Sequence, residues 1–398
     1  MSVNIHDKKK IALVLSGGGI KAAAFHIGVC LALKEKGFVF EGGTKESVQI
    51  RNTKGPKIQT YVGSSAGAFV SAVLASGRSI ESLITAFQVG AGDSPFYAVP
   101  EEENLKPIGY RHMFNINSAR ILSFLPETLF RKSMLTGGIE VFLKEGFKLN
   151  GLFNTNGIER YLRKYVLDEN EFSRLGVELY IIATQLNHSR KVVFGNYLEN
   201  SKDENALYLG TSKVSEAVAA STALPPVFAP YPITLPDYKK EIYLYDGEIR
   251  DTLSTHVAAD HGADLIIASY SMQPYHYAEE MGSLHKYGIP AIVNQALYQV
   301  LEQKVARSIQ YQDQKKKLYG ELKKICATEG VSSELTNKIL GSIEKNLVFK
   351  PEVDYVYIAP RPQNYEMFFA DHFSLNPEIL EKILWIGFKS GLSTLRHL

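Results

Sequence analysis

The chain has 398 residues, enough for one large domain or for two or three smaller ones. Hydrophobic residues make up 45% of the chain and charged residues 22%, as in ordinary globular proteins, and this composition excludes a disordered or fibrous protein. Lys and Arg number 44 against 42 Asp and Glu, a near balance that argues against binding to the phosphates of nucleic acids.

The N-terminal residues predict a strand rather than a targeting sequence. Lys8–Lys10 precede the apolar run Ile11–Leu15, which is too short for the core of a signal peptide and ends at a serine and three glycines. No stretch of the sequence has the roughly 18 consecutive apolar residues of a membrane span. We therefore expect a cytoplasmic protein in which any membrane contact is peripheral, with export by a route without a cleaved signal as the open alternative.

Strand and helix signals alternate through the N-terminal part of the chain. The strand at Ile11–Leu15 is followed by a helical pattern at Lys21–Lys36, and a second buried strand at Ile58–Gly63 is followed by an Ala-rich helix at Ser65–Ala75. An order of strand, helix, strand and helix is typical of a parallel sheet.

Two segments interrupt this alternation farther along the chain. Residues 90–155 are punctuated by Gly and Pro and predict a cap, and residues 278–348 predict an inserted helical hairpin because apolar side chains recur every four positions. Further strands are predicted at Val177–Ala183, Lys191–Phe194, Glu241–Tyr245, Asp264–Ser269 and Val353–Ile358, and a last helix at Pro377–Leu395. The sheet is therefore expected to continue on both sides of the helical hairpin.

A Gly-x-Ser-x-Gly pattern lies at the second strand-to-helix junction. In a nucleophile elbow the serine adopts a strained backbone conformation between a strand and a helix, and the residues two positions on either side must be small. Ser65 lies midway between Gly63 and Gly67, and the neighbouring Ala66 is small as well. Ser65 is therefore a candidate nucleophile, while a tight turn without chemistry is the alternative interpretation.

Three consecutive glycines, Gly17–Gly19, lie at the first strand-to-helix junction. Glycines before a helix can turn backbone N–H groups outward, where these groups can hold an oxyanion or a phosphate. The same segment fits the Gly-x-Gly-x-x-Ala fingerprint of dinucleotide-binding folds, with Ala22 at the last position and Glu41 about twenty residues farther on. A dinucleotide-dependent enzyme is therefore a second hypothesis, although it gives no role to the serine motif.

Two later segments complete a family pattern. Ala220–Phe228 predicts a helix end that runs into a proline-rich turn, and Tyr243–Glu248 places Asp246 at the end of a strand. With the glycine loop and the serine motif, these segments resemble the patatin-like phospholipase family. That family combines a glycine-rich oxyanion loop, a Gly-x-Ser-x-Gly serine, an Ala-Ser-x-Ala-x-Pro-x-x-Phe block and an aspartate followed by glycine. The resemblance covers roughly residues 9–90, 150–270 and 352–395.

The resemblance implies hydrolysis of lipid acyl esters by a Ser–Asp dyad. Asp246 would accept the proton of Ser65, whose oxygen attacks the ester carbonyl to form an acyl-enzyme. The implied oxyanion donors are the backbone N–H groups of Gly17, Gly18, Gly19 and Ala66. The implied supporting residues are Gly63, Gly67, Gly247 and Lys21. Two positions depart from the family pattern: Ala22 replaces a glycine, and Glu248 replaces a glycine or alanine and is expected to raise the pKa of Asp246 if it points into the site.

We therefore expect one patatin-like catalytic domain over residues 9–395, with three α/β/α layers around a central, mostly parallel sheet. The cap would occupy residues 90–155 and the helical insertion residues 278–348. A lipid is the expected substrate. Residues 106–150 carry seven Lys or Arg against three Glu, together with an apolar cluster, so they are expected either to contact a lipid surface or to seal the cap onto the sheet.

Three alternatives remain open: an ordinary Ser-His-Asp esterase, a dinucleotide-dependent enzyme and a catalytically silent lipid-binding protein. The histidines that follow Asp246 and could complete an ordinary triad are His256, His261, His276, His285, His372 and His397. The only cysteines, Cys30 and Cys326, form no metal-binding pattern, and we expect no metal or other cofactor.

Overall fold

The computed structural model describes residues 5–50, 54–89, 104–116, 150–196, 205–235 and 240–397. Most of the predicted cap at 90–155 lies outside these ranges, and so do the basic and apolar residues between 117 and 149 that motivated a lipid contact there. The motifs around Ser65 and Asp246 all lie inside the described ranges.

A ten-stranded sheet forms the centre of the fold. Its main path runs in the order β12, β11, β1, β3, β6, β10 and β9, and β2, β7 and β8 pair beside it. The bounds are β1 Ile11–Leu15, β2 Val39–Phe40, β3 Lys57–Ser64, β6 Glu178–Gln185, β7 Lys191–Phe194, β8 Ala206–Leu209, β9 Tyr231–Leu235, β10 Lys240–Asp246, β11 Leu265–Ser269 and β12 Asp354–Ile358. Neighbours from β12 to β6 are parallel, while β6 pairs antiparallel with β10 and β7, and β10 with β9. The expected mostly parallel sheet is confirmed.

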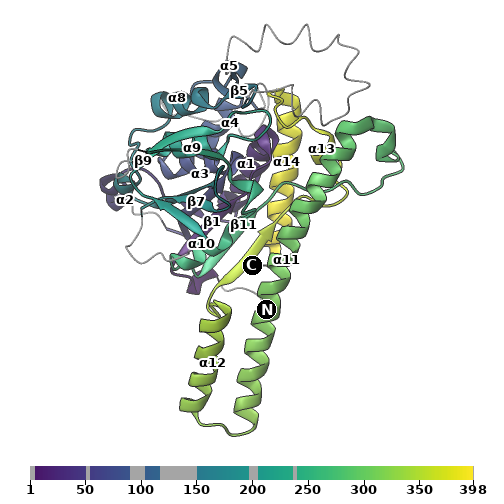
Figure 1. Cartoon of the computed structure of the whole chain (residues 1–398). Helices are drawn as coiled ribbons and strands as arrows, with labels where there is room; N and C mark the ends of the chain where they lie inside the picture. Colours follow the sequence, from purple (N-terminus) through teal and green to yellow (C-terminus); the bar gives the residue numbers. More distant parts are fainter. Residues whose placement is uncertain are drawn as a thin grey trace.

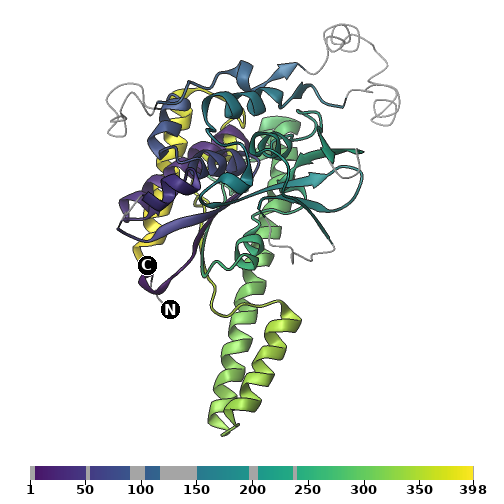
Figure 2. The same cartoon turned by 90° about the vertical axis from the view of Figure 1, so that its left-hand side faces the viewer.

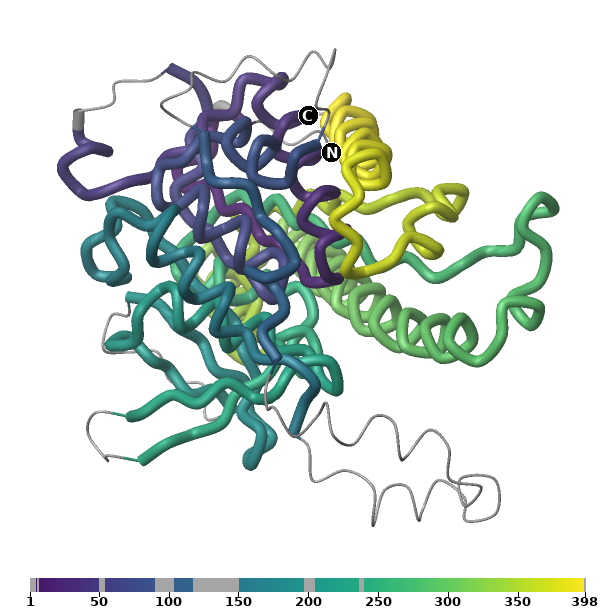
Figure 3. Tube along the Cα trace, turned by 90° about the horizontal axis from the view of Figure 1, so that it is seen from above, coloured from purple at the N-terminus to yellow at the C-terminus, as the bar shows by residue number. Residues whose placement is uncertain are grey.

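Helices cover both faces of this sheet. Ile11, Leu13 and Leu15 of β1 pack with side chains of α1, α3 and α14, whereas Ala12 and Val14 point to the opposite face and pack with α10. The α-helices are α1 Gly19–Glu35, α2 Lys45–Ile50, α3 Ala66–Ala75, α4 Ile80–Ala86, α5 Tyr110–Met113, α8 Asn156–Tyr165, α9 Val214–Ser221, α10 Thr255–Asp260, α11 Gly288–Thr328, α12 Ser333–Leu347, α13 Glu366–Phe369 and α14 Pro377–Thr394. A short antiparallel pair joins β4, Asn115–Ile116, to β5, Phe153–Asn154. Three layers result, and α1 lies beside α14 (Figure 3).

The segment predicted as a helical insertion contains α11 and α12. The two helices run antiparallel and extend well beyond the α/β body (Figures 1 and 2). Tyr319 of α11 donates a hydrogen bond to Glu344 of α12 at 2.8 Å, and Ser332 caps the start of α12 by accepting from the N–H of Leu335. Among the described helices, none combines the length and apolar character needed to cross a bilayer.

Candidate active site

The turn that carries Ser65 has the geometry of a nucleophile elbow. Ser65 lies between the end of β3 and the start of α3, with φ 50° and ψ −120°, a conformation that costs a non-glycine residue free energy. A Cβ on Gly63 would lie 2.5 Å from the carbonyl oxygen of Gly67, and a Cβ on Gly67 would lie 2.2 Å from that of Leu15. Both glycines are therefore required by close backbone approach.

Strand register brings Asp246 to this turn. Ser64 of β3 pairs with Ile182 of β6, and the next residue of β6, Ala183, pairs with Asp246 of β10. The buried carboxylate of Asp246 accepts a hydrogen bond from the N–H of Glu248 at 2.9 Å, and the neighbouring Ser65 side chain favours its ionised form. Burial raises the pKa of Asp246 to about 6, and the Ser65 side chain and the N–H of Glu248 oppose that rise because they favour the ionised form.

The proline-rich block forms hydrogen bonds with both Ser65 and Asp246. Ser221, the last residue of α9, accepts a hydrogen bond from the N–H of Ser65 at 2.8 Å and donates one to the carbonyl of Ile182 at 2.5 Å. The N–H of Asp246 donates to the carbonyl of Ala223 at 3.1 Å. Sequence reasoning gave Ser221 no individual role, although its place in the Ala-Ser-x-Ala block was the signal that could have found it.

The glycine loop passes directly over the elbow. Gly18 has φ 133° and Gly19 has φ 74°, and a Cβ on Gly19 would lie 2.4 Å from the carbonyl oxygen of His372. Gly19 and Ala66 are the first residues of α1 and α3, so their N–H groups have no acceptor within their own helices. Two helix N-termini therefore converge beside Ser65.

Buried His26 fixes the start of this loop. Its Nε2 lies 2.9 Å from the carbonyl oxygen of Ser16 and its Nδ1 lies 2.8 Å from Oγ of Ser269. Because a carbonyl only accepts, Nε2 carries the proton and Nδ1 accepts from the Ser269 hydroxyl. Burial lowers the pKa of His26 to about 4, so the ring is neutral at neutral pH.

Glu248 changes the expected role of Gly17. The N–H of Gly17 donates to Oε1 of Glu248 at 2.7 Å, and the hydroxyl of Ser64 donates to the same oxygen. The prediction that Gly17 supplies an oxyanion donor is therefore wrong for this conformation, because its N–H group is already occupied. Burial raises the pKa of Glu248 to about 8, with the nearby Asp246 carboxylate adding to the rise. Among the described residues, none forms a hydrogen bond with Oε2 of Glu248.

The side chain of Lys21 bonds to the C-terminal part of the chain. Its ammonium group donates to the carbonyl oxygens of Met367 at 2.7 Å and Ala370 at 2.9 Å, at the end of α13. Burial lowers the pKa of Lys21 to about 7. Lys21 therefore ties the start of α1 to the C-terminal part of the chain, next to the glycine loop that it was expected to support.

A cavity of about 330 Å³ opens beside Ser65 and Asp246. Most of its wall is apolar, and α11 supplies one side through Leu297, Val300 and Leu301. The aromatic part of the wall comes from Phe69, Phe87, Phe228, Tyr298 and Phe373. An apolar cavity of this kind beside a serine at a strained turn suits a ligand with a hydrocarbon chain.

A family model of patatin-like phospholipases matches residues 13–259, which include the glycine loop, the elbow, the proline-rich block and Asp246. The chain belongs to the patatin-like phospholipase family. Membership implies a lipid acyl hydrolase. The helical hairpin, β12 and α14 lie beyond the matched residues.

Two further comparisons add little to this assignment. No curated protein sequence matches the chain. Among solved structures, VipD from Legionella pneumophila is similar at 17% identity and a TM-score of 0.37, with 99% of this chain and 67% of VipD covered. At this level of similarity the match carries no conclusion about function.

The histidines that could have completed an ordinary triad lie elsewhere or face other partners. His372 lines the cavity, but its Nε2 lies 3.2 Å from the hydroxyl of Tyr298 and its other hydrogen bond goes to the backbone of Gly18. Burial lowers the pKa of His372 to about 4. Among the hydrogen bonds that Asp246 makes with the described residues, none involves a histidine. The side chain of His397 lies outside the described set.

The features expected of a dinucleotide or metal site are weak. Glu41, the candidate ribose ligand, is buried and forms an ion pair with Lys57 at 2.9 Å. Within the described ranges, no three His, Cys, Asp or Glu side chains converge as a metal site would require.

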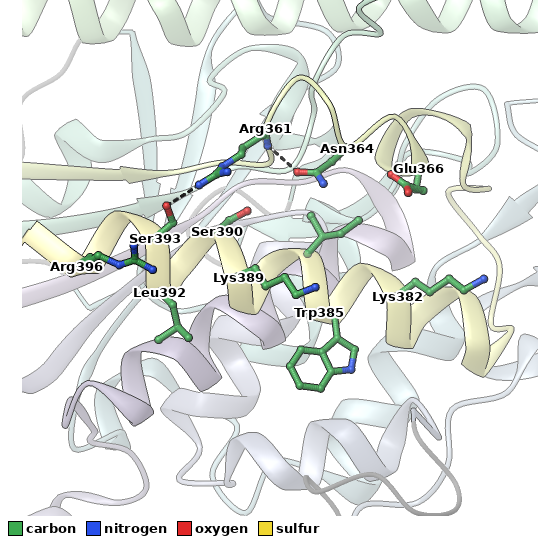
Figure 4. Close-up of a pocket in the computed structure, with 11 residues that line it drawn as sticks. Arg361, Asn364, Glu366, Lys382, Trp385, Lys389, Ser390, Leu392, Ser393 and Arg396 are labelled. Carbon is green, nitrogen blue, oxygen red and sulfur yellow. Dashed lines mark hydrogen bonds between the residues drawn. The ribbon is translucent and has the colours of Figure 1, made fainter. Parts of the chain in front are cut away.

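A second hollow, of about 930 Å³, lies along α14 between Arg361, Lys382, Trp385 and Arg396 (Figure 4). None of the motif residues lines this hollow.

Proposed function

We propose that the chain is a phospholipase A-type hydrolase that cleaves the acyl esters of membrane lipids, with Ser65 as the nucleophile and Asp246 as the general base. One observation carries this proposal. Ser65 lies at a strained turn beside an apolar cavity, where its side chain favours the ionised form of the buried Asp246 carboxylate.

Acylation begins when Oγ of Ser65 forms a bond to the ester carbonyl carbon and Asp246 accepts the Ser65 hydroxyl proton. The carbonyl oxygen becomes an oxyanion, and the N–H groups of Gly18, Gly19 and Ala66 are the proposed donors to it. Each such donor commonly contributes about 3 kcal/mol to the stability of the transition state. As the tetrahedral intermediate collapses, the proton on Asp246 passes to the leaving alcohol oxygen.

Deacylation reverses these roles with water in place of the alcohol. Asp246 accepts a proton from water, the resulting hydroxide attacks the acyl carbon, and the proton returns to the Ser65 oxygen as the fatty acid leaves. Although the pKa of Asp246 is raised to about 6, the carboxylate is still mostly ionised at neutral pH, and the shift brings its basicity closer to the working pH.

Labelling with a fluorophosphonate followed by peptide mapping tests the nucleophile. We expect the label on Ser65, and we expect Ser65→Ala to abolish both labelling and turnover of phospholipid esters. Ser342→Ala, which changes an exposed serine of α12, is the matched control and should behave as the parent protein. Labelling of another serine, or labelling that survives Ser65→Ala, would contradict the proposal.

A further inference from the structure

The first turns of α11 form an uncharged surface helix. Residues 288–301 are fourteen in number and contain no Asp, Glu, Lys, Arg or His, whereas ten of the next 27 residues of the helix, 302–328, are charged. At the 22% of charged residues in the whole chain, about three would be expected in fourteen positions. The lack of charge is therefore confined to the part of α11 next to the catalytic body.

Five apolar side chains of this segment are exposed and lie near one another along the helix. The exposed fractions are 76% for Ile289, 49% for Ile292, 60% for Val293, 52% for Leu297 and 53% for Val300. Their spacing of three or four residues places most of them along one side of the helix. We refer to these five residues as the α11 strip. A contiguous exposed apolar strip on a protein surface marks an interaction site.

The α11 strip is continuous with the catalytic cavity. Leu297 and Val300 are half exposed and also line the cavity beside Ser65. Between them, Tyr298 is buried, packs edge-on against Phe368 at 5.7 Å and faces His372. The helix is therefore fixed to the site, while its N-terminal turns extend to the edge of the molecule (Figure 3).

We propose that the α11 strip inserts into the surface of a lipid bilayer, so that an acyl chain can pass along it from the bilayer into the cavity. Insertion of apolar side chains is favourable, and a segment without charges carries no desolvation penalty for ionised groups. The identity of the occupant follows from the cavity that the strip adjoins, because its apolar wall holds a hydrocarbon chain better than a polar peptide. The transfer of an acyl chain rests on the proposed function, whereas binding of the strip to the bilayer does not require catalysis.

Sedimentation with phosphatidylcholine vesicles tests the binding step. All proteins carry Ser65→Ala to prevent turnover. The strip variant replaces Ile289, Ile292 and Val293 by Ser. None of these three residues lines the cavity. The matched control replaces three exposed apolar residues of the distal hairpin, Leu318, Ile325 and Leu335, by Ser. We expect the parent and the control to bind vesicles, and the strip variant to bind at least about tenfold more weakly because three apolar side chains no longer leave water.

A second measurement does not depend on loss of binding. In Val293→Trp, the new indole should shift its fluorescence to shorter wavelength when vesicles are added and should be quenched by brominated lipid tails, whereas Leu318→Trp should respond to neither. Equal vesicle binding by the strip variant and the parent would overturn the proposal. So would a Val293→Trp fluorescence that does not change when vesicles are added. A parent dimer that the strip variant dissociates, with vesicle binding unchanged, would overturn it in favour of a second copy of the chain.

Activity separates this proposal from the proposed function. With Ser65 intact, the strip variant should hydrolyse a short, water-soluble ester as fast as the parent does but should turn over vesicle lipid at least about tenfold more slowly. Equal loss on both substrates would overturn the role of the strip in delivery. Failure of Ser65 labelling would contradict the proposed nucleophile and leave the vesicle-binding result standing.

Discussion

The Asp246 carboxylate combines two properties that a general base needs. The neighbouring Ser65 side chain favours its ionised form, and burial raises its pKa to about 6. A carboxyl group accepts a proton only when it is ionised, so Asp246, as the proposed base, would be inactive below this pKa and active above it. The Ser65 side chain and the N–H of Glu248 hold the pKa of Asp246 below the value that burial alone would produce.

Two consequences for kinetics follow from this environment. We expect kcat/KM to rise with pH through about 6 as Asp246 loses its proton in the free enzyme. Asp246→Asn should lower kcat by at least about a hundredfold at neutral pH and should remove this rise. Steady-state kinetics on a soluble ester from acid to neutral pH measure both effects.

His372→Ala provides the contrast because this side chain lines the same cavity without bonding to Asp246. It should keep most of the turnover. A loss equal to that of Asp246→Asn in a folded protein would instead assign the chain an ordinary Ser-His-Asp mechanism.

At the scale of single elements, α9 connects the elbow to the sheet through the hydrogen bonds of Ser221. The hydroxyl of Ser221 links the N–H of Ser65 to the carbonyl of Ile182 on β6. One side chain therefore fixes the strained residue relative to the strand that also aligns Asp246. Without it, the N–H of Ser65 would lose a buried acceptor, which costs about 1–3 kcal/mol.

We expect Ser221→Ala to lower kcat by about tenfold or more with little change in KM, because it loosens the position of the nucleophile and leaves the cavity wall intact. Ser215→Ala is the matched control: Ser215 is buried in the same helix and bonds to Asn170 and Glu159. Both variants should lose stability, but only Ser221→Ala should lose kcat. Equal kinetic effects would contradict a specific role for Ser221.

Most of the larger elements could be predicted from local patterns. β1 and β7 begin and end at the predicted residues, α14 differs from its prediction by one residue at its C-terminal end, and β10 is one residue longer than predicted at each end. The strands β2, β8 and β9 were not predicted: β2 has only two residues, and β9 contains Pro232, which argues against a strand in a sequence pattern. The elbow could be predicted because all of its requirements lie within five consecutive residues.

The partners of Gly17 and Lys21 could not be predicted in the same way. Gly17 meets Glu248, which is 231 positions away in the sequence, and Lys21 meets Met367 across 346 positions. Such contacts depend on the order of strands in the sheet and on the path of the C-terminal segment. A glycine-rich pattern indicates that N–H groups point outward, but it does not indicate which side chain from a distant strand will occupy them.

Across the whole molecule, two buried carboxyl groups at one site make folding sensitive to pH. Glu248 has an ordinary pKa of 4.5, and burial raises it to about 8 in the folded protein. Below pH 4.5 the group is protonated in both folded and unfolded chains and imposes no penalty. As pH rises from 4.5 to 8, the unfolded chain releases the proton while the folded protein retains it, so the free energy of unfolding falls. Asp246 contributes in the same direction as pH rises from 3.8 to about 6.

Replacement of Glu248 by Gln isolates its part of this effect. The amide oxygen can still accept from Gly17 and Ser64, but the side chain no longer ionises. We expect Glu248→Gln to melt at a higher temperature than the parent, with a difference that is small near pH 4.5, grows up to about pH 8 and is constant above it. Thermal unfolding followed by circular dichroism measures this difference, and Glu321→Gln, which removes an exposed carboxylate, controls for the change in net charge. Each unit of pKa shift corresponds to about 1.4 kcal/mol of unfolding free energy. The expected change in the melting temperature should therefore be measurable even if the pKa shift is only half as large.

A difference in melting temperature that does not vary with pH would mean that Glu248 ionises at the same pH in the folded and unfolded chains. In that case its contact with Gly17 would be the bond of an ordinary carboxylate, and the elbow would have a second negative charge beside Asp246 at neutral pH.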